Sequence, residues 1–238
     1  MPWKGVDMTV TRTETLPLTD GRELRLTVAE PENAVRGGLV VLHEARGVTD
    51  TVRGLVSSLA DEGWLAVAPH LYPDADELDR DDGDGVRDQV RRLSGDAVLA
   101  DTDVAFVWLG EQGVRTDRMG VMGFDLGGSV AMVVAGSRTI GAAVTVGGGG
   151  ILRPLSDGLP SLVEVAEELT CPWLGLYGDE DGEIRVADVD TLRDAAASAP
   201  VATDVVCFAD SSHRFDSSPV ASAEAWQRAL NWFDSHLR

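Results

Sequence analysis

An aspartate stands at the centre of a glycine-bounded pentapeptide, Gly123-Phe124-Asp125-Leu126-Gly127. Small residues at both ends of such a segment allow a sharp turn from a strand into a helix, and the turn exposes the central side chain as a nucleophile. The apolar run before this pentapeptide and the alanine- and valine-rich run after it are typical of that strand and that helix. The same aspartate could instead cap the N-terminus of the helix.

Two further side chains could complete a catalytic set with Asp125. In enzymes with this turn, an acid follows a later strand and a histidine follows the last one. His213 follows the last apolar run, and both Asp179 and Asp181 follow the run before it. We prefer Asp181 as the acid, because it lies beyond the turn and could point back at His213. There it would hold the tautomer of the imidazole and stabilise the imidazolium. A second histidine, His43, could line the same site.

Strand and helix patterns alternate along the chain from residue 38 onwards. Short apolar runs are typical of buried parallel strands, and apolar side chains every three to four residues are typical of helices. Strands are predicted at residues 38–42, 64–69, 119–122, 142–146, 173–177 and 205–208. Helices are predicted at residues 50–62, 96–112, 126–136, 186–198 and 221–237. This order predicts an α/β fold with a doubly wound, mostly parallel sheet and right-handed crossovers.

Two segments lie outside this alternation. Residues 8–30 alternate between polar and apolar side chains around Asp20-Gly21, which predicts an antiparallel hairpin at the edge of the sheet. Residues 73–95 are polar and rich in aspartate and glycine, and we interpret them as a surface loop that leads into a helix. The chain leaves no room for a large inserted cap domain, so a single domain over residues 1–238 is expected.

In combination, these motifs resemble the dienelactone hydrolase family of the α/β-hydrolase superfamily. Residues 40–48 are similar to the family's strand-plus-loop segment, which carries a glutamate at the position of Glu44. Residues 59–72 are similar to the segment that usually ends in Pro-Asp-Leu-Tyr. Residues 121–128 are similar to its Gly-Phe-Cys-Leu-Gly-Gly turn. The resemblance covers nearly all of residues 8–237 and implies a catalytic triad.

The resemblance also implies roles for individual residues. The family nucleophile is cysteine, or serine in some members, and Asp125 stands in its place. Glu44 would then face a second carboxylate, and two close anions raise the pKa of one of them. The backbone N–H groups of Ala45 and Leu126 are the expected oxyanion donors. The candidates for binding a substrate carboxylate are Arg46, Arg80, Arg87 and Arg214.

An aspartate at this turn restricts the chemistry. Attack on an ester carbonyl would give a mixed anhydride, whereas attack on a saturated carbon displaces a halide or opens an epoxide and leaves an alkyl ester on the enzyme. His213, oriented by Asp181, would then activate water. Haloalkane dehalogenases and epoxide hydrolases, which also carry an aspartate at this position, work in this way.

We therefore predict a hydrolase of a small lactone, ester or alkyl electrophile such as a halide or epoxide. One alternative is a lyase, isomerase or cyclase in which Asp125 or His213 moves a proton. Another is a catalytically silent protein, or a family member whose nucleophile has been substituted.

Charge and composition limit the classes of partner that the protein can bind. The net charge is −20, with 40 acidic against 20 basic side chains, which argues against nucleic acid and against anionic membranes. No window of the sequence is apolar enough to span a bilayer, and the N-terminus has no apolar leader segment. We expect a cytoplasmic protein with a small-molecule substrate. The sequence leaves its oligomeric state open.

Cofactor and metal motifs are not evident. No group of His, Cys and Asp has the spacing of metal ligands, so neither a metal nor another cofactor is expected. Gly147-Gly148-Gly149-Gly150 is followed by neither a P-loop lysine nor a helix, and we interpret it as a flexible loop. Cys171 and Cys207 lie in apolar stretches and are expected to be buried and free.

Overall fold

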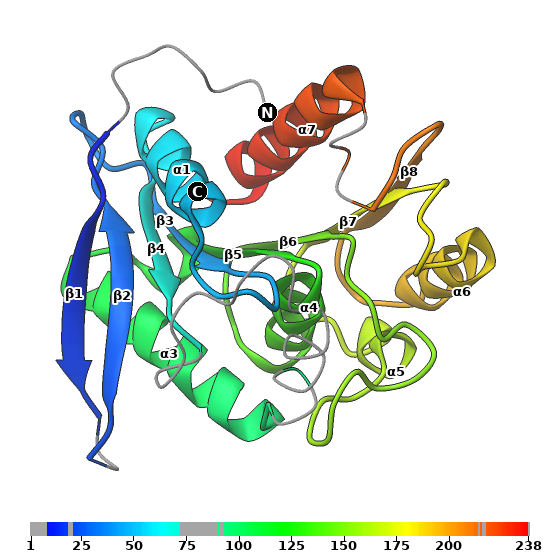
Figure 1. The fold of residues 1–238 in the computed structure, drawn as a ribbon, viewed down its shortest axis with the longest axis horizontal. Coiled ribbons are helices and arrows are strands. Elements are labelled where there is room, and N and C mark those ends of the chain that lie inside the picture. Colours follow the sequence, from blue (N-terminus) through cyan, green and yellow to red (C-terminus); the bar gives the residue numbers. More distant parts are fainter. Residues whose placement is uncertain are drawn as a thin grey trace.

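One sheet contains the eight strands of the computed structural model, which describes residues 9–18, 21–71, 90, 93–213, 215 and 218–237. The strand order is β1-β2-β4-β3-β5-β6-β7-β8 (Figure 1). The predicted hairpin is confirmed, because β1 (Arg12–Pro17) pairs antiparallel with β2 (Glu23–Ala29) at one edge. Asp20 of its expected turn lies outside the described residues, as does most of the expected loop at residues 73–95.

Six parallel strands form the rest of the sheet, as predicted. They are β3 (Gly38–Leu42), β4 (Leu65–Pro69), β5 (Met119–Phe124), β6 (Ala142–Val146), β7 (Trp173–Gly178) and β8 (Thr203–Phe208). Every residue of β3, β4 and β6 is buried, which explains their continuous apolar sequences. Since the strands run in the same direction, the loops that follow them meet along one edge of the sheet.

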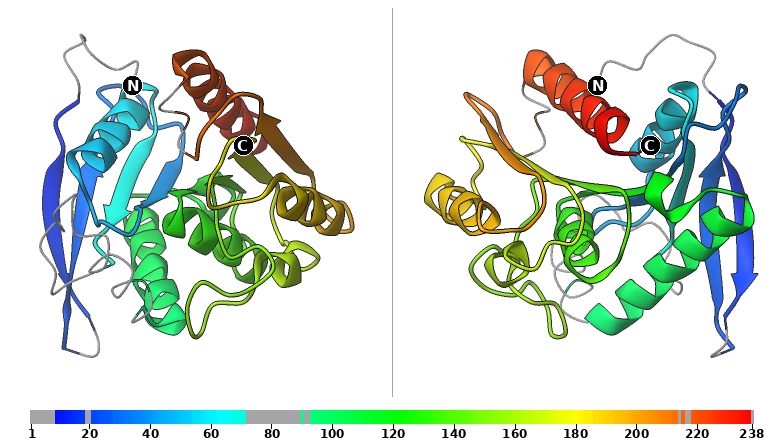
Figure 2. Two further views of the ribbon diagram at one scale, coloured as in Figure 1. Left: turned by 45° about the vertical axis from the view of Figure 1, so that its right-hand side comes forward. Right: turned by 180° about the vertical axis from the view of Figure 1, so that it is seen from behind.

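Helices cover both faces of the sheet (Figures 1 and 2). One face packs against α1 (Asp50–Asp61) and α7 (Pro219–His236). The other face packs against α3 (Gly95–Glu111), α4 (Leu126–Ser137), α5 (Leu162–Ala166) and α6 (Val186–Ala196). The doubly wound α/β prediction is therefore confirmed. None of the helices in the described part of the chain is long and apolar enough to cross a bilayer.

Two local expectations need correction. The short helix α5 was not predicted, although Ser161 and Glu164 form a capping box at its start. That Ser-x-x-Glu spacing is a recognisable signal, but a helix of five residues is too short to show an apolar period. Cys171 is buried as expected, whereas Cys207 on β8 is only partly buried, and both are free thiols.

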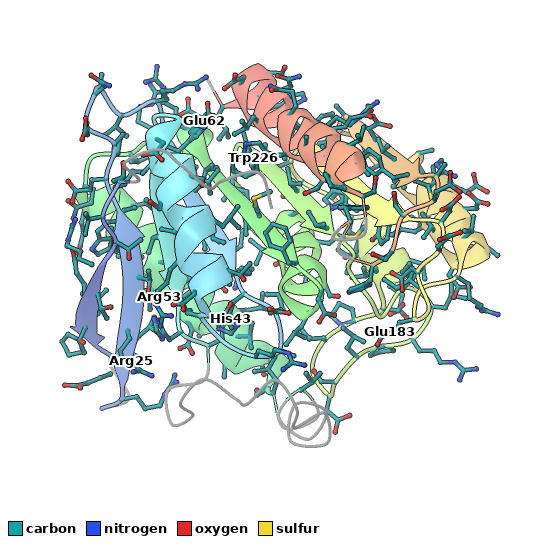
Figure 3. All side chains as sticks on the ribbon, turned by 45° about the horizontal axis from the view of Figure 1, so that its top comes forward. Arg25, His43, Arg53, Glu62, Glu183 and Trp226 are labelled. Atoms are coloured by element: carbon teal, nitrogen blue, oxygen red, sulfur yellow. The ribbon has the colours of Figure 1, made fainter. Side chains whose placement is uncertain are left out.

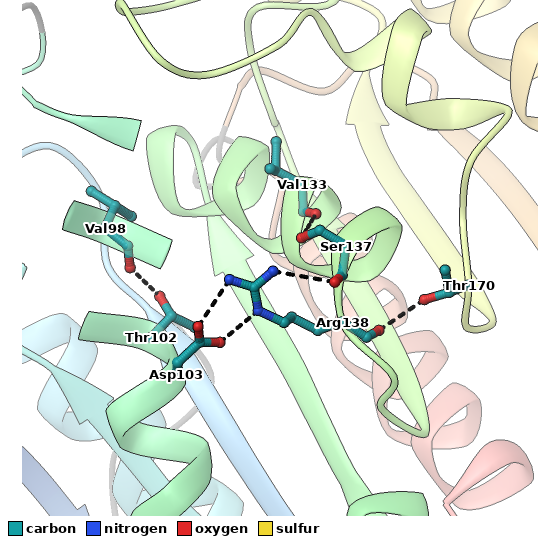
Figure 4. Close-up of polar contacts among 7 residues, drawn as sticks. All are labelled: Val98, Thr102, Asp103, Val133, Ser137, Arg138 and Thr170. Atoms are coloured by element: carbon teal, nitrogen blue, oxygen red, sulfur yellow. Dashed lines mark hydrogen bonds and ion pairs between the residues drawn. The ribbon is translucent and has the colours of Figure 1, made fainter. Parts of the chain in front are cut away.

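Hydrogen bonds to α3 and to Thr170 hold the C-terminal end of helix α4 in place. Arg138, directly after the helix, donates from Nε and Nη2 to the two carboxylate oxygens of Asp103 in α3, at 2.7 and 2.9 Å (Figure 4). The Thr170 hydroxyl lies 2.8 Å from the carbonyl oxygen of Arg138 and 2.9 Å from that of Ala135. A paired guanidinium–carboxylate contact adds geometric specificity as well as energy. These contacts fix the direction in which the helix approaches Asp125.

The N-terminal end of α4 lies very close to the sheet. A Cβ atom at Gly127 would lie 2.2 Å from the carbonyl oxygen of Leu42 and 2.6 Å from that of His43. A Cβ atom at Gly123 would lie 1.9 Å from the carbonyl oxygen of Gly127. Only glycine fits at these two positions, because the obstructing atoms belong to the backbone. The glycines of the pentapeptide are therefore required by close packing of the helix on β3 and β5.

We expect Gly127→Ala to lower the free energy of unfolding by about 1–3 kcal/mol, because the methyl group would have to push α4 away from β3. Urea unfolding followed by circular dichroism measures this change. Gly182→Ala is the matched control, since a Cβ atom there meets nothing within 4 Å. Equal stability of the two variants would contradict the packing argument.

Candidate active site

Asp125 adopts a strained backbone conformation between β5 and α4. Its φ is 53° and its ψ is −118°, a combination that costs energy for a residue with a side chain. The backbone is held by a hydrogen bond from Asp125 N–H to the carbonyl of Val146, 2.9 Å, and by one from Ser129 N–H to the Asp125 carbonyl, 3.1 Å. Asp125 occupies the N-cap position of α4, but its side chain makes no capping hydrogen bond to the helix.

His213 lies between two carboxylates. Its Nδ1 is 2.5 Å from Oδ2 of Asp181, and its Nε2 is 3.7 Å from Oδ1 of Asp125. The imidazole is 20% exposed and the Asp125 side chain 29%, whereas Nε2 of His213 is itself buried and makes no hydrogen bond within the described part of the chain. The structure therefore brings together the three residues that the sequence indicated as nucleophile, acid and histidine.

The carboxylate of Asp181 is fully engaged. Its side chain is 1% exposed, and Oδ1 accepts hydrogen bonds from the N–H groups of Glu183 at 2.8 Å and Ile184 at 3.0 Å. The remaining oxygen is the one that faces His213. Asp179 has a different task, because its Oδ1 accepts a hydrogen bond from Ser211 N–H at 3.3 Å. The two candidates left open by the sequence are thus distinguished by their partners.

The loop that carries His213 is shaped by two more strained residues. Among the described residues, the only non-glycine positions with positive φ are Asp125, Asp210 at 53° and Phe215 at 56°. Phe215 is buried, and its ring meets that of Phe208 edge-on with centroids 5.0 Å apart. This aromatic contact anchors the loop to the end of β8. Strain at all three positions is concentrated at the site, as is usual for functional backbone.

The glycine run at residues 147–150 supports the histidine. Gly147 has a φ of 58°, and a Cβ atom there would lie 3.1 Å from Cε1 of His213. The Ser129 hydroxyl of α4 donates to the carbonyl of Gly149, 2.8 Å. The run therefore packs between the first turns of α4 and the imidazole. Its sequence gave no sign of this role, because glycine runs are read locally as loops.

The charges of the site favour a protonated histidine. Contact with the Asp125 carboxylate raises the pKa of His213, and the hydrogen bond to Asp181 raises it further; together they outweigh burial and bring the pKa to about 9. At neutral pH the resting site therefore contains an imidazolium between two carboxylates. At neutral pH such a histidine is a poor base until one of the neighbouring charges is removed.

The remaining predicted site residues follow β3 and β5. Leu42 pairs with Gly123 across the two strands, so Glu44 and Asp125 each lie two residues beyond this pair at the same edge. Ala45 is buried, while Arg46 is partly exposed. Leu126 is the first residue of α4, and an amide at that position has no acceptor within its own helix. The roles of these residues stay predictions, and Arg80, Arg87 and Arg214 lie outside the described residues.

His43 serves the scaffold. The side chain is fully buried, its Nδ1–H donates to the Glu44 carbonyl at 2.7 Å, and its Nε2 accepts a hydrogen bond from Leu71 N–H at 3.1 Å. Burial lowers the pKa of His43 to about 4, so the ring is neutral. Figure 3 shows His43, after β3, and Glu183, after β7, toward the same end of the sheet. The expectation that His43 lines the site is wrong, because the ring is enclosed between backbone groups.

A sequence model of the dienelactone hydrolase family matches residues 24–237. The chain belongs to this family. A relative from Yersinia pestis named "Putative carboxymethylenebutenolidase" is 30% identical over 234 residues, which cover 94% of this chain and 88% of the relative. A relative of the same name from Escherichia coli K12 is 32% identical over 83% of this chain and 76% of its own length.

Solved structures agree with the sequence relatives. The crystal structure of a "Putative Dienelactone Hydrolase" from Klebsiella pneumoniae superposes with a TM-score of 0.88 at 28% identity and covers 97% of this chain and 100% of its own. The predicted resemblance and the α/β-hydrolase fold are therefore confirmed, and the chain is a hydrolase of the dienelactone hydrolase type. Within the described residues, no group of three or more His, Cys, Asp or Glu side chains could hold a metal ion.

We expect Asp125→Asn to lower the pKa of His213 from about 9, because contact with Asp125 is the largest of the influences that raise it. The pH titration of the histidine Cε1–H signals by NMR measures this pKa, and His213→Gln identifies the signal. Asp179→Asn is the control, since Asp179 bonds to backbone beside the histidine and not to its ring. A pKa that is unchanged in Asp125→Asn would contradict the proposed contact.

The stability of this family member should fall as the pH is lowered from 6.5 towards 4. The folded state keeps His43 neutral down to about pH 4, whereas the unfolded chain binds a proton near its ordinary pKa of 6.5. The unfolded state therefore gains protons in this window, at a cost to stability of up to about 1.4 kcal/mol per pH unit. Urea unfolding at several pH values measures the slope of the free energy of unfolding against pH. We expect a smaller slope for His43→Gln than for the unmodified protein. Equal slopes would refute this account.

Proposed function

We propose that this hydrolase acts on small electrophiles at a saturated carbon atom, through a covalent ester on Asp125. The substrate class comprises alkyl halides, epoxides, and lactones or esters that are opened at their alkyl carbon. The observation that carries the proposal is the Asp125 carboxylate on a strained turn, directed at Nε2 of a histidine that Asp181 orients. A carboxylate beside a histidine that a second carboxylate orients is suited to nucleophilic and acid–base chemistry.

The first step forms one bond and breaks one bond. An oxygen of the Asp125 carboxylate attacks the saturated carbon, and the leaving group departs with the bonding electrons. The product is an alkyl ester of Asp125, which is more stable than the mixed anhydride that attack on an acyl group would give. Where the leaving group is an epoxide oxygen, the imidazolium of His213 lies beside Asp125 and can supply a proton.

Formation of the ester then changes the charge state of His213. The Asp125 carboxylate is the largest influence that raises the pKa of His213, and esterification removes its charge. The pKa of the imidazole falls towards its ordinary value, and the proton on Nε2 is released. Nδ1–H stays bonded to Asp181, so the free lone pair appears on Nε2, next to the ester. The histidine becomes a base only after the intermediate has formed.

Hydrolysis of the ester completes the cycle. His213 takes a proton from water, and the hydroxide formed attacks Cγ of Asp125. The oxyanion can accept hydrogen bonds from the N–H groups of Leu126, at the start of α4, and Ala45, in the loop after β3. Collapse of this intermediate expels the alcohol, which takes up the proton from His213, and the carboxylic acid left at Asp125 returns its proton to His213. One carboxylate oxygen of Asp125 then derives from water.

The isotope content of Asp125 tests this route. The protein is incubated in ¹⁸O-water under single-turnover conditions with a primary alkyl bromide, an aryl epoxide or a β-lactone, and the peptide that contains Asp125 is analysed by mass spectrometry. We expect ¹⁸O in Asp125 for the substrate that reacts. His213→Gln should accumulate the alkyl ester, because no base remains to activate water, and Asp125→Asn should form no adduct.

The other outcomes separate the alternatives. Product formed without label in Asp125 would overturn the covalent route and favour proton transfer by Asp125 or His213. If no substrate reacts and His213→Gln gains no mass, the catalytically silent alternative is supported instead.

A further inference from the structure

Thr145 on β6 lies between two glycines of the neighbouring strands. It pairs with Gly123 of β5 on one side and with Gly175 of β7 on the other, and its side chain is fully buried. Glycines on both flanks leave space over the sheet that larger residues would fill. The question is what occupies this space and what Thr145 contacts there.

The first turn of α4 and the indole of Trp173 occupy the space. A Cβ atom at Gly123 would lie 1.9 Å from the carbonyl oxygen of Gly127, so the helix passes directly over this glycine. A Cβ atom at Gly175 would lie 2.7 Å from Cη2 of Trp173, so the indole folds over the other one. Thr145 therefore separates the start of α4 from a fully buried tryptophan.

The hydroxyl of Thr145 joins these two groups. It donates to the carbonyl of Gly128 in the first turn of α4, 3.0 Å, and it accepts the indole N–H of Trp173, 2.9 Å. The methyl group of Thr145 would lie 2.6 Å from a Cβ atom at Gly148, so it also packs against the glycine run that supports His213. All these groups are buried, where an unmade hydrogen bond is costly.

Strand β6 thus holds both sides of Asp125. The carbonyl of Val146 accepts the hydrogen bond from Asp125 N–H, and the neighbouring Thr145 holds Gly128, three residues further along the chain. A residue with strained backbone keeps its conformation only when its surroundings determine it from several directions. The two contacts from β6 are such surroundings.

We propose that Thr145, fixed by Trp173, is a positioning residue that sets the separation between the Asp125 carboxylate and the His213 imidazole. Its effect on turnover rests on the proposed function, whereas its effect on the geometry does not. Loss of its hydroxyl would leave the Gly128 carbonyl and the indole N–H without their partner and let the first turn of α4 shift. Asp125 would move with it, away from His213.

Two substitutions at this position test the proposal. Thr145→Val keeps the shape and removes the hydroxyl, and Thr145→Ser keeps the hydroxyl. We expect Thr145→Val to lower the pKa of His213, measured by NMR titration, by about one unit, since a nearby opposite charge shifts a pKa by about one to three units. Thr145→Ser should keep the pKa of the unmodified protein.

Thr102→Val is the matched control for a loss of stability without a change in geometry. Thr102 is also fully buried, and its hydroxyl donates to a helical carbonyl, that of Val98 in α3, at 2.7 Å (Figure 4). This variant should lose stability and keep the pKa of His213. An unchanged pKa in Thr145→Val, or equal shifts in Thr145→Val and Thr145→Ser, would overturn the proposal.

Further readouts keep the test decisive. If Thr145→Val does not fold, Trp173→Phe removes the indole N–H together with one ring of the indole and leaves the Thr145 hydroxyl in place. It should lower the same pKa in part, and an unchanged pKa would again overturn the proposal. For a substrate that labels Asp125, Thr145→Val should reduce kcat more than it changes KM. A pKa shift without labelling of Asp125 would reject the proposed function and retain the positioning role. Labelling of Asp125 together with an unchanged pKa of His213 would support the proposed function and reject the positioning role.

Discussion

An imidazolium held between two carboxylates is the interaction on which this structure depends. Asp181 is buried and satisfied by two backbone amides, so it remains an anion that orients the ring of His213. Asp125 stands on the other side at 3.7 Å, with strained backbone and a partly exposed side chain. One carboxylate is thus fixed and the other is available to react. Because of this asymmetry, loss of the negative charge at Asp125 lowers the pKa of His213.

The fold supplies the precision for this arrangement mainly through close backbone approach. Glycines allow α4 to lie against β3 and β5, and others allow the histidine loop to lie against the ends of β6 and β7. Hydrogen bonds to β6, the strand beside β5, then determine where the first turn of α4 lies. The atoms that close in on these glycines are largely backbone atoms, which move aside less readily than side chains do.

Family membership and the residue at the turn give separate information. The family match extends over residues 24–237 and establishes the fold and the class of enzyme. The aspartate at position 125 then limits the electrophile, because a carboxylate forms a useful intermediate at saturated carbon and an unstable one at an acyl group. The proposed substrate class therefore follows from the chemistry of one side chain on a shared scaffold.

The sequence by itself determined the succession of strands and helices along the chain apart from α5, the hairpin at the edge, the turn at Asp125, and the positions of His213 and of a nearby acid. These features have local signals: apolar periodicity, glycine spacing, and polar residues directly after strands. Only the tertiary structure decided that Asp181 faces the histidine while Asp179 holds the loop, and that His43 is enclosed by the scaffold. It also revealed Thr145 between two glycines, and the packing of residues 147–150 against the imidazole. The reason is that these contacts join residues far apart in the chain, and strand order and register, which local patterns do not encode, determine which of them meet.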